Sequence, residues 1–154
     1  YKRQQQVILN GENVTSLLRT EETGKMASKT SKYAAVRTKL VALQRGLAKK
    51  TDVIMDGRDI GTTVLPDAFA KIYLTASSDA RAKRRYDELK EKGENCSFDA
   101  IKEDIEKRDY EDMHRAISPL KQADDAVLVD TSDMNIEQVV AALSKIIDEK
   151  KAGR

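Results

Sequence analysis

The 154-residue sequence contains no tryptophan, only two phenylalanines and two prolines, and a single cysteine. One cysteine excludes an internal disulfide framework and fits a reducing compartment. No long apolar run is present, and we predict neither a transmembrane span nor a signal peptide. The formal net charge is only +2, so the overall charge gives no reason to expect nucleic acid or a membrane as a partner.

The sequence also lacks the phosphate-binding signature G-x-x-x-x-G-K-[ST]. Its only Gly-Lys pair, Gly24-Lys25, is followed by Met26 and has no glycine five residues before it. The chain opens at Tyr1 without an initiator methionine. We therefore expect it to be part of a longer protein.

Short apolar runs bounded by turn residues alternate with segments of helical periodicity. We predict a hairpin at 7–15 and strands at 53–55, 70–77 and 126–132. We predict helices at 20–50 (with a break near 28–31), from 77 or 78 to 93, from 97 to before 119 and at 135–150. In the last helix, Ile136, Val140, Leu143 and Ile147 are expected to face inward. Strands that alternate with helices predict an α/β fold, with a parallel sheet covered by helices.

Charged residues gather where the predicted strand 53–55 ends, in the stretch Asp56-Gly57-Arg58-Asp59. Ligands of parallel α/β sheets bind at the carboxyl ends of the strands. The alternative is an ordinary tight turn, in which Gly57 adopts an unusual backbone conformation and Asp59 caps the segment after it.

The predicted helix after Ser97 carries a single stripe of residues that changes from apolar to charged. Its members are Phe98, Ile101, Ile105, Arg108, Asp112 and Arg115. Two arginines around one carboxylate leave surplus positive charge, which favours an anionic ligand. The alternative is a solvated ladder of ion pairs.

A third group is basic, with Arg81, Arg84 and Arg85 on adjoining positions of the preceding predicted helix. The planar arginine fork is well suited to phosphate. Arginines on helices are as often simply solvated, so this group is ambiguous by itself.

In combination, the stretches DGRDIGTTVLPDA, SSDARAKRR and EKRDYEDMHRAISPL resemble bacterial cytidylate kinase, a member of the nucleoside monophosphate kinase group of P-loop kinases. The stretch LLRTEETGKMASKTSKYAAVR fits the same pattern, and the resemblance runs from about Val7 to Ala142. It implies transfer of the γ-phosphoryl group of ATP, with Mg²⁺, to CMP or dCMP. It also implies a cytoplasmic enzyme of pyrimidine metabolism that is a monomer at full length.

The resemblance assigns roles by position. Ser28, Arg37 and Asp59 match residues that read cytosine, because a carboxylate accepts from the amino group and an arginine donates to the ring acceptors. Arg108 and Asp112 match residues that hold the ribose, and Arg58 and Arg115 match arginines on the acceptor phosphate. Arg81, Arg84 and Arg85 lie on the ATP side, with Arg84 as the candidate lid arginine in transfer. The candidate catalytic residues are therefore Arg58, Arg84 and Arg115, and no residue is assigned to a metal.

The resemblance further implies that residues 1–30 are part of an insert that binds the nucleoside monophosphate. Residues 31–154 would form the core, with a lid around 84–98. Since the phosphate loop is absent from the sequence, we expect this chain alone to be inactive. Two alternatives stay open: another nucleoside monophosphate kinase, or a non-catalytic nucleotide-binding module.

In the family, a central strand lies between the two that match 53–55 and 71–75. Its sequence is not found here, and the gap would be about 10 Å because neighbouring strands are about 4.8 Å apart. We expect either that another segment supplies the strand or that 53–55 and 71–75 pair directly.

Overall fold

The computed structural model describes residues 6–18 and 20–153. It divides the chain into two compact units, Tyr1–Thr51 and Asp52–Arg154, and each is described by itself. The predicted insert of residues 1–30 falls in the first unit, with residues 1–5 and 19 outside the described residues. That this segment binds the nucleotide stays a prediction.

The first unit begins with the predicted hairpin. Strands β1 (Ile8–Leu9) and β2 (Glu12–Asn13) are antiparallel. Asn10 and Gly11 turn between them with φ values of 52° and 88°, as a two-residue hairpin turn requires. A short 3-10 helix, η1 (Thr15–Leu17), follows.

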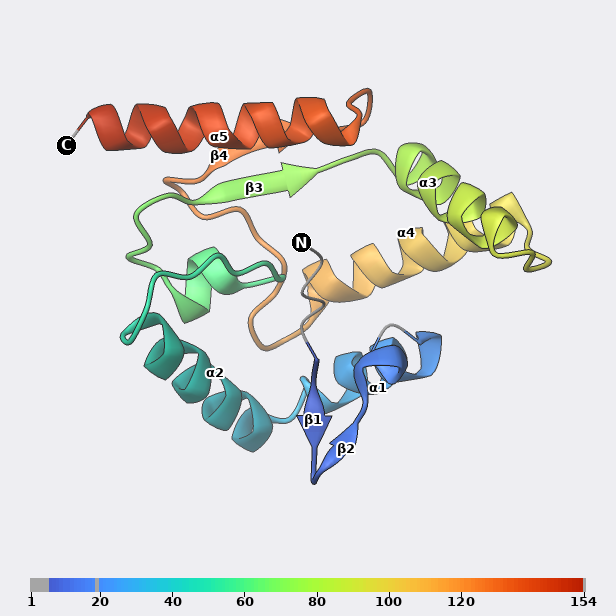
Figure 1. The fold of residues 1–154 in the computed structure, drawn as a ribbon, viewed down its shortest axis with the longest axis horizontal. Coiled ribbons are helices and arrows are strands. Elements are labelled where there is room, and N and C mark those ends of the chain that lie inside the picture. The colour runs from blue at the N-terminus through green and yellow to red at the C-terminus, as the bar shows by residue number, and fades with distance from the viewer. Residues whose placement is uncertain (1–5, 19, 154) are drawn as a thin grey trace. The chain divides into compact units, whose positions relative to one another are not determined.

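Two helices complete this unit (Figure 1). Helix α1 (Glu21–Thr30) begins at Thr20, whose side chain accepts a hydrogen bond from the Thr23 amide. Helix α2 (Ala34–Ala48) follows after the predicted break. Serine and threonine cap helices because their side chains satisfy amides that have no partner within the helix.

The second unit contains a two-stranded parallel sheet, which confirms the α/β prediction. Strand β3 (Ile72–Thr75) pairs with β4 (Val127–Asp130), so that Ile72 lies opposite Val127 and Thr75 opposite Asp130. Helix α5 (Ile136–Ala152) follows β4 and runs back in the opposite direction (Figure 1). Asn135 and Gln138 form a capping box at its start.

Helices α3 (Ser78–Glu91) and α4 (Phe98–His114) lie between the two strands in sequence and pack against each other. Ser77 and Ser97 cap them, at the helix starts that the sequence predicts. Gly93 ends the first with a φ of 75°, a conformation that favours glycine. A π-helical turn, η2 (Ile60–Val64), precedes β3.

Residues 53–55 do not form a strand, contrary to the prediction. Within the described residues β3 pairs only with β4, so the expected direct pairing of 53–55 with β3 is wrong as well. These residues have no ladder partner within the described residues, and Ile54 is 99% exposed. The other arrangement, with a further strand between them, stays a prediction.

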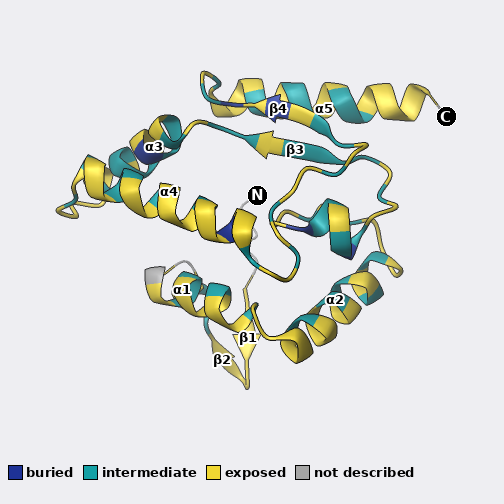
Figure 2. Ribbon diagram, turned by 180° about the vertical axis from the view of Figure 1, so that it is seen from behind, coloured by how far each residue is buried: buried dark blue, intermediate teal, exposed yellow. Residues whose placement is uncertain are grey.

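The buried residues of the described chain all lie in the second unit, at separate points on or next to η2, α3, α4 and β4 (Figure 2). Its buried apolar residues are Val64, Ala82 and Val129. In α5, Ile136 is 78% exposed and Val140 is 56% exposed, so the prediction that both face inward is wrong. The helical period allows more than one apolar stripe here, and α5 instead turns Val139, Leu143 and Ile147 toward partial cover. Within the described residues, no helix combines the length and apolar character that a membrane span needs.

One ion pair joins the segments that enter β3 and β4. Lys71 Nζ lies 2.6 Å from Asp125 Oδ1, and the lysine side chain is only 9% exposed. It also donates to the Pro66 carbonyl. The hydrogen bond from Lys71 holds the pKa of the Asp125 carboxyl below its ordinary value of 3.8.

We expect Asp125→Asn to lower the melting temperature at pH 7, because the nearly buried Lys71 loses its counter-charge. A depressed folded-state pKa stabilises the fold above the unfolded pKa, and this contribution is lost as the pH falls through the folded value. The difference between wild type and variant should therefore disappear in acid. Thermal unfolding followed by circular dichroism from pH 7 to about pH 2 measures it, with the exposed neighbour Asp124→Asn as the control. A difference that stays constant over this range would contradict the assignment.

Candidate functional site

Four charged side chains predicted as site residues come together in the second unit. Arg58 Nε lies 2.8 Å from Asp112 Oδ2. Arg115 approaches both carboxylates, with Nη1 3.7 Å from Asp112 Oδ1 and Nη2 4.0 Å from Asp59 Oδ1. We call Arg58, Asp59, Asp112 and Arg115 the charged cluster.

The carboxylates of the charged cluster are withdrawn from water. Asp59 is 9% exposed and Asp112 is 7% exposed, which makes them two of the three buried polar residues of the described chain. A buried charge is stable only with compensating partners, and the arginines supply the compensation. The alternative of a solvated ion-pair ladder is therefore wrong for Asp112.

Some hydrogen-bonding capacity of the charged cluster is unused. Asp112 Oδ2 and Arg115 Nη2 are buried, and neither makes a hydrogen bond in the described structure. The contact between Arg58 and Asp112 is thus an ion pair without hydrogen-bond geometry. Buried polar atoms of native proteins are nearly always hydrogen-bonded, so these two atoms mark a place where a polar ligand can bind.

The Asp59 side chain does not cap the segment that follows it, which the tight-turn alternative required. It precedes η2, and its side chain makes no cap hydrogen bond with that turn. Gly57 does not have a positive φ. A Cβ at Gly57 would lie 3.0 Å from Ile60 Cγ1, so a side chain at this position would require Ile60 to shift.

A tight turn after α4 holds Arg115 in place. Arg115 Nε donates to the Ser118 carbonyl at 2.5 Å, and the Leu120 amide donates to the Asp112 carbonyl at 2.8 Å. Ser118 has a φ of 49°, which is uncommon for a residue with a side chain. Sequence reasoning missed Ser118, and the Ser-Pro pair was the only local signal, since it indicates a turn.

Arg108 lies outside this arrangement. It is exposed, and within the described residues it makes no ion pair with Asp59 or Asp112. Its assignment to the ribose stays a prediction.

The three predicted ATP-side arginines have different environments. Arg81 is bound to Asp109 of α4 through both of its terminal nitrogens. Arg84 donates to the carbonyls of Thr131 and Met134, in the loop after β4. Arg85 pairs with Glu88 at 2.8 Å on the surface of α3. Only Arg85 has the environment of a solvated helix arginine.

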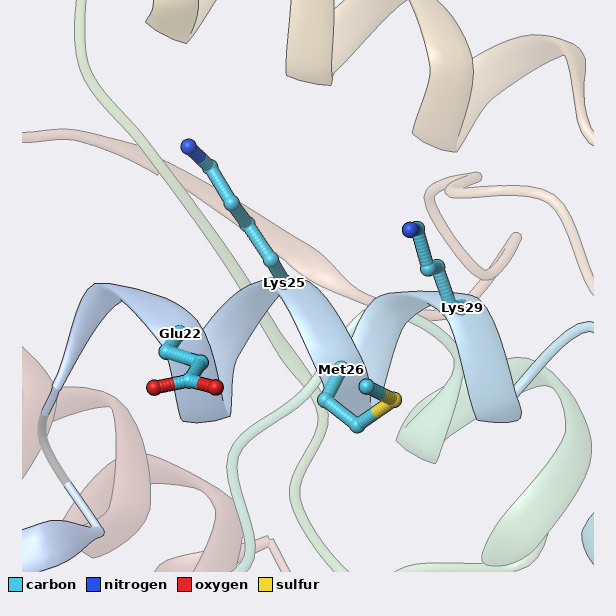
Figure 3. A pocket seen from close by; sticks show the side chains of 4 residues that line it. All are labelled: Glu22, Lys25, Met26 and Lys29. Atoms are coloured by element: carbon cyan, nitrogen blue, oxygen red, sulfur yellow. The ribbon is translucent and has the colours of Figure 1, made fainter.

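Ser28 and Arg37 belong to the first unit, in α1 and α2, and both are half-buried. Their predicted contact with cytosine stays a prediction. A hollow on the surface of α1 contains neither residue, and its lining side chains are Glu22, Lys25, Met26 and Lys29 (Figure 3). All four project from one helix, so the hollow brings no distant segments together.

The charged cluster offers two kinds of recognition. The two guanidinium groups present N–H donors that suit phosphate. The two carboxylates accept hydrogen bonds from amino or hydroxyl groups. A ligand with a phosphate, hydroxyl groups and an exocyclic amine would satisfy all of them. In the described part of the chain, no group of three or more histidine, cysteine or acidic residues could hold a metal ion.

Comparison of the sequence with known proteins identifies its family. The sequence matches the cytidylate kinase family over residues 1–149. The cytidylate kinase of Lactobacillus johnsonii is 51% identical over 148 residues, which cover 96% of this chain and 64% of that protein. The cytidylate kinases of Thermosipho melanesiensis and Enterococcus faecalis are each 47% identical, over 92% and 95% of this chain and 65% of their own lengths. The chain thus spans slightly less than two thirds of the curated relatives that it matches. It belongs to the cytidylate kinase family.

Proposed function

We propose that the protein carrying this chain transfers the γ-phosphoryl group of ATP to CMP or dCMP, forming CDP or dCDP. The observation that carries the proposal is the charged cluster, in which two nearly buried carboxylates lie between two arginines. Family membership over residues 1–149 supports the same assignment.

Asp59 is proposed to read the base, together with Ser28 and Arg37. Its carboxylate accepts a hydrogen bond from the amino group of cytosine, whereas uracil would present a carbonyl oxygen at that point. The Asp59 carboxylate and this carbonyl oxygen are both acceptors, so neither would have a hydrogen-bond donor in the nearly dry site. The penalty falls on uracil and gives base selectivity.

Asp112 is proposed to hold the ribose, with Arg108 beside it. The buried oxygen Oδ2 forms an ion pair with Arg58 but makes no hydrogen bond in the described structure, and a sugar hydroxyl would donate one to it. The ion pair with Arg58 keeps this carboxylate charged and oriented.

Arg58 and Arg115 are proposed to bind the acceptor phosphate. Phosphoryl transfer depends mainly on the alignment of the two phosphates and on neutralisation of their charge. ATP enters with Mg²⁺ as the co-substrate and supplies the phosphoryl group. Arg84 is proposed to act from the lid around residues 84–98, and Arg81 and Arg85 are predicted on the same side.

The remaining assignments follow from the same proposal. Residues 1–30 would contribute to the insert that binds CMP, and residues 31–154 to the core. The protein would work as a cytoplasmic monomer with nucleotides as its only partners, and this chain alone would be inactive. Competition of CMP, UMP and AMP for one site separates the proposal from another monophosphate kinase, and turnover with ATP separates it from a non-catalytic module.

Asp59→Ala should reduce the preference for CMP over UMP more than it reduces turnover with a saturating nucleotide. A base contact of this kind discriminates by about 1–3 kcal/mol, so the ratio of the two kcat/KM values should fall by roughly 5-fold to 150-fold. Coupled ADP-release kinetics of the full-length protein with both nucleotides measure the ratio. The exposed carboxylate Asp56 gives the matched control, Asp56→Ala. An unchanged ratio in Asp59→Ala would refute the role of Asp59.

Arg115→Met should weaken the binding of CMP but not that of cytidine, because only CMP carries the phosphate. The loss of a charge-assisted contact of about 1.5–3 kcal/mol corresponds to a 10-fold to 150-fold rise in Kd. Calorimetric titration with CMP and with cytidine measures both constants. The control is Lys83→Met, which removes a cation from an exposed pair with Asp87 on α3. Equal losses for the nucleoside and the nucleotide would contradict the phosphate assignment.

A further inference from the structure

The guanidinium group of Arg81 donates hydrogen bonds to the Asp109 side chain and to the Ala76 backbone carbonyl. Its Nη1 donates to Asp109 Oδ1 at 3.0 Å and its Nη2 donates to Asp109 Oδ2 at 2.5 Å. Its Nε donates to the Ala76 carbonyl, also at 3.0 Å. The two parallel bonds to one carboxylate give the fork geometry, which is directional as well as strong.

These contacts connect three elements at one point. Arg81 belongs to the first turn of α3, Ala76 follows directly on β3, and Asp109 lies on α4. The carboxyl end of β3 is thereby tied to α4. Asp109 also stands three residues before Asp112, so it is a neighbour of Asp112 along the same face of the helix.

The remaining contacts between α3 and α4 fix their relative position less firmly. Ala82 is fully buried, and the rings of Tyr86 and Phe98 meet edge to face with centroids 6.3 Å apart. Apolar burial is not directional. Lys102 and Asp79 form an ion pair at 2.8 Å, and Ser78 Oγ donates to Glu106 Oε1 at 2.8 Å. The Asp79 side chain is 65% exposed and the bond from Ser78 is exposed as well, and such exposed polar contacts contribute little.

The pair between Arg81 and Asp109 is directional, and its side chains are less exposed than that of Asp79. Its side chains are 34% and 22% exposed, and it is bidentate. Among the polar contacts described between the two helices, it also lies nearest to the charged cluster in sequence. The rotation and the axial position of the last turns of α4 therefore depend on it more than on any other described contact between these helices.

We propose that Arg81 and Asp109 are positioning residues for the CMP half of the site, which rests on the function proposed above. They hold α4 at the orientation in which Asp112 meets Arg58 and Arg115 reaches the charged cluster. Arg81 acts through α4 and does not contact the nucleotide. This role differs from the ATP-side role that the resemblance implied for Arg81.

The two roles predict opposite kinetic effects. In Arg81→Met, the apolar stem is kept and the fork is lost. The KM for CMP should rise about tenfold, because small displacements of aligned groups have large effects on substrate use, while the KM for ATP should stay within about twofold of wild type. Arg81→Lys keeps the charge but cannot make the bidentate contact together with the Nε bond, so it should resemble Arg81→Met. Steady-state kinetics of the full-length protein, with each substrate varied at saturation of the other, give both constants.

Lys102→Met is the matched control, because it breaks a polar contact between the same two helices. It should leave both KM values within about twofold of wild type. Asp109→Asn keeps the shape of the side chain and removes its charge. If circular dichroism shows that Arg81→Met does not fold, Asp109→Asn tests the same pair by a change on the α4 side.

A cycle with Asp112→Asn tests whether Arg81 acts through the charged cluster. If it does, Arg81→Met should raise the Kd for CMP by less than about twofold when Asp112 is already changed. Three results would overturn the proposal: a rise in the KM for ATP with that for CMP unchanged, a lower melting temperature with both KM values unchanged, or additive losses in the cycle. A full-length wild-type protein that does not phosphorylate CMP would instead overturn the proposed function itself.

Discussion

The burial of Asp112 between Arg58 and Arg115 is the constraint on which the site depends. A carboxylate at 7% exposure would be strongly disfavoured without cations at hand. The two cations, Arg58 and Arg115, come from segments 57 positions apart in the sequence (115 − 58). To satisfy one buried charge, the chain must therefore bring the loop after Gly57 to the end of α4. That juxtaposition also places Asp59 within 4.0 Å of Arg115.

The segments around the charged cluster have local features that suit this arrangement. Gly57 leaves room for Ile60, so η2 can follow directly after Asp59. Ser118 adopts a left-handed backbone conformation and directs its carbonyl at Arg115 Nε. A residue held in such a conformation costs of order 1–3 kcal/mol and persists where the surroundings require it. Here the requirement is the orientation of one guanidinium group.

The same residue type serves four purposes in this unit. Arg58 and Arg115 surround a carboxylate, Arg84 binds carbonyls of the loop after β4, and Arg85 pairs with Glu88 on the surface. Arg81 joins two helices and a strand end. Since the pair of Arg81 with Asp109 and the charged cluster are on the same helix, the packing of α3 against α4 and the geometry of the site are linked.

The sequence by itself determined the elements with strong local signals. The Asn10-Gly11 turn, the serine caps at Ser77 and Ser97 and the box of Asn135 with Gln138 depend on residues within a few positions of one another. Helical spacing also grouped Asp112 and Arg115 with Arg108, and the resemblance added Arg58 and Asp59. All of these except Arg108 come together in the structure. Tertiary structure alone decided the rest. Residues 53–55 have strand character but no ladder partner, the apolar period of α5 left its inward face ambiguous, and the partner of Arg81 is 28 residues away. Pairing and burial depend on distant segments, and no local pattern encodes them.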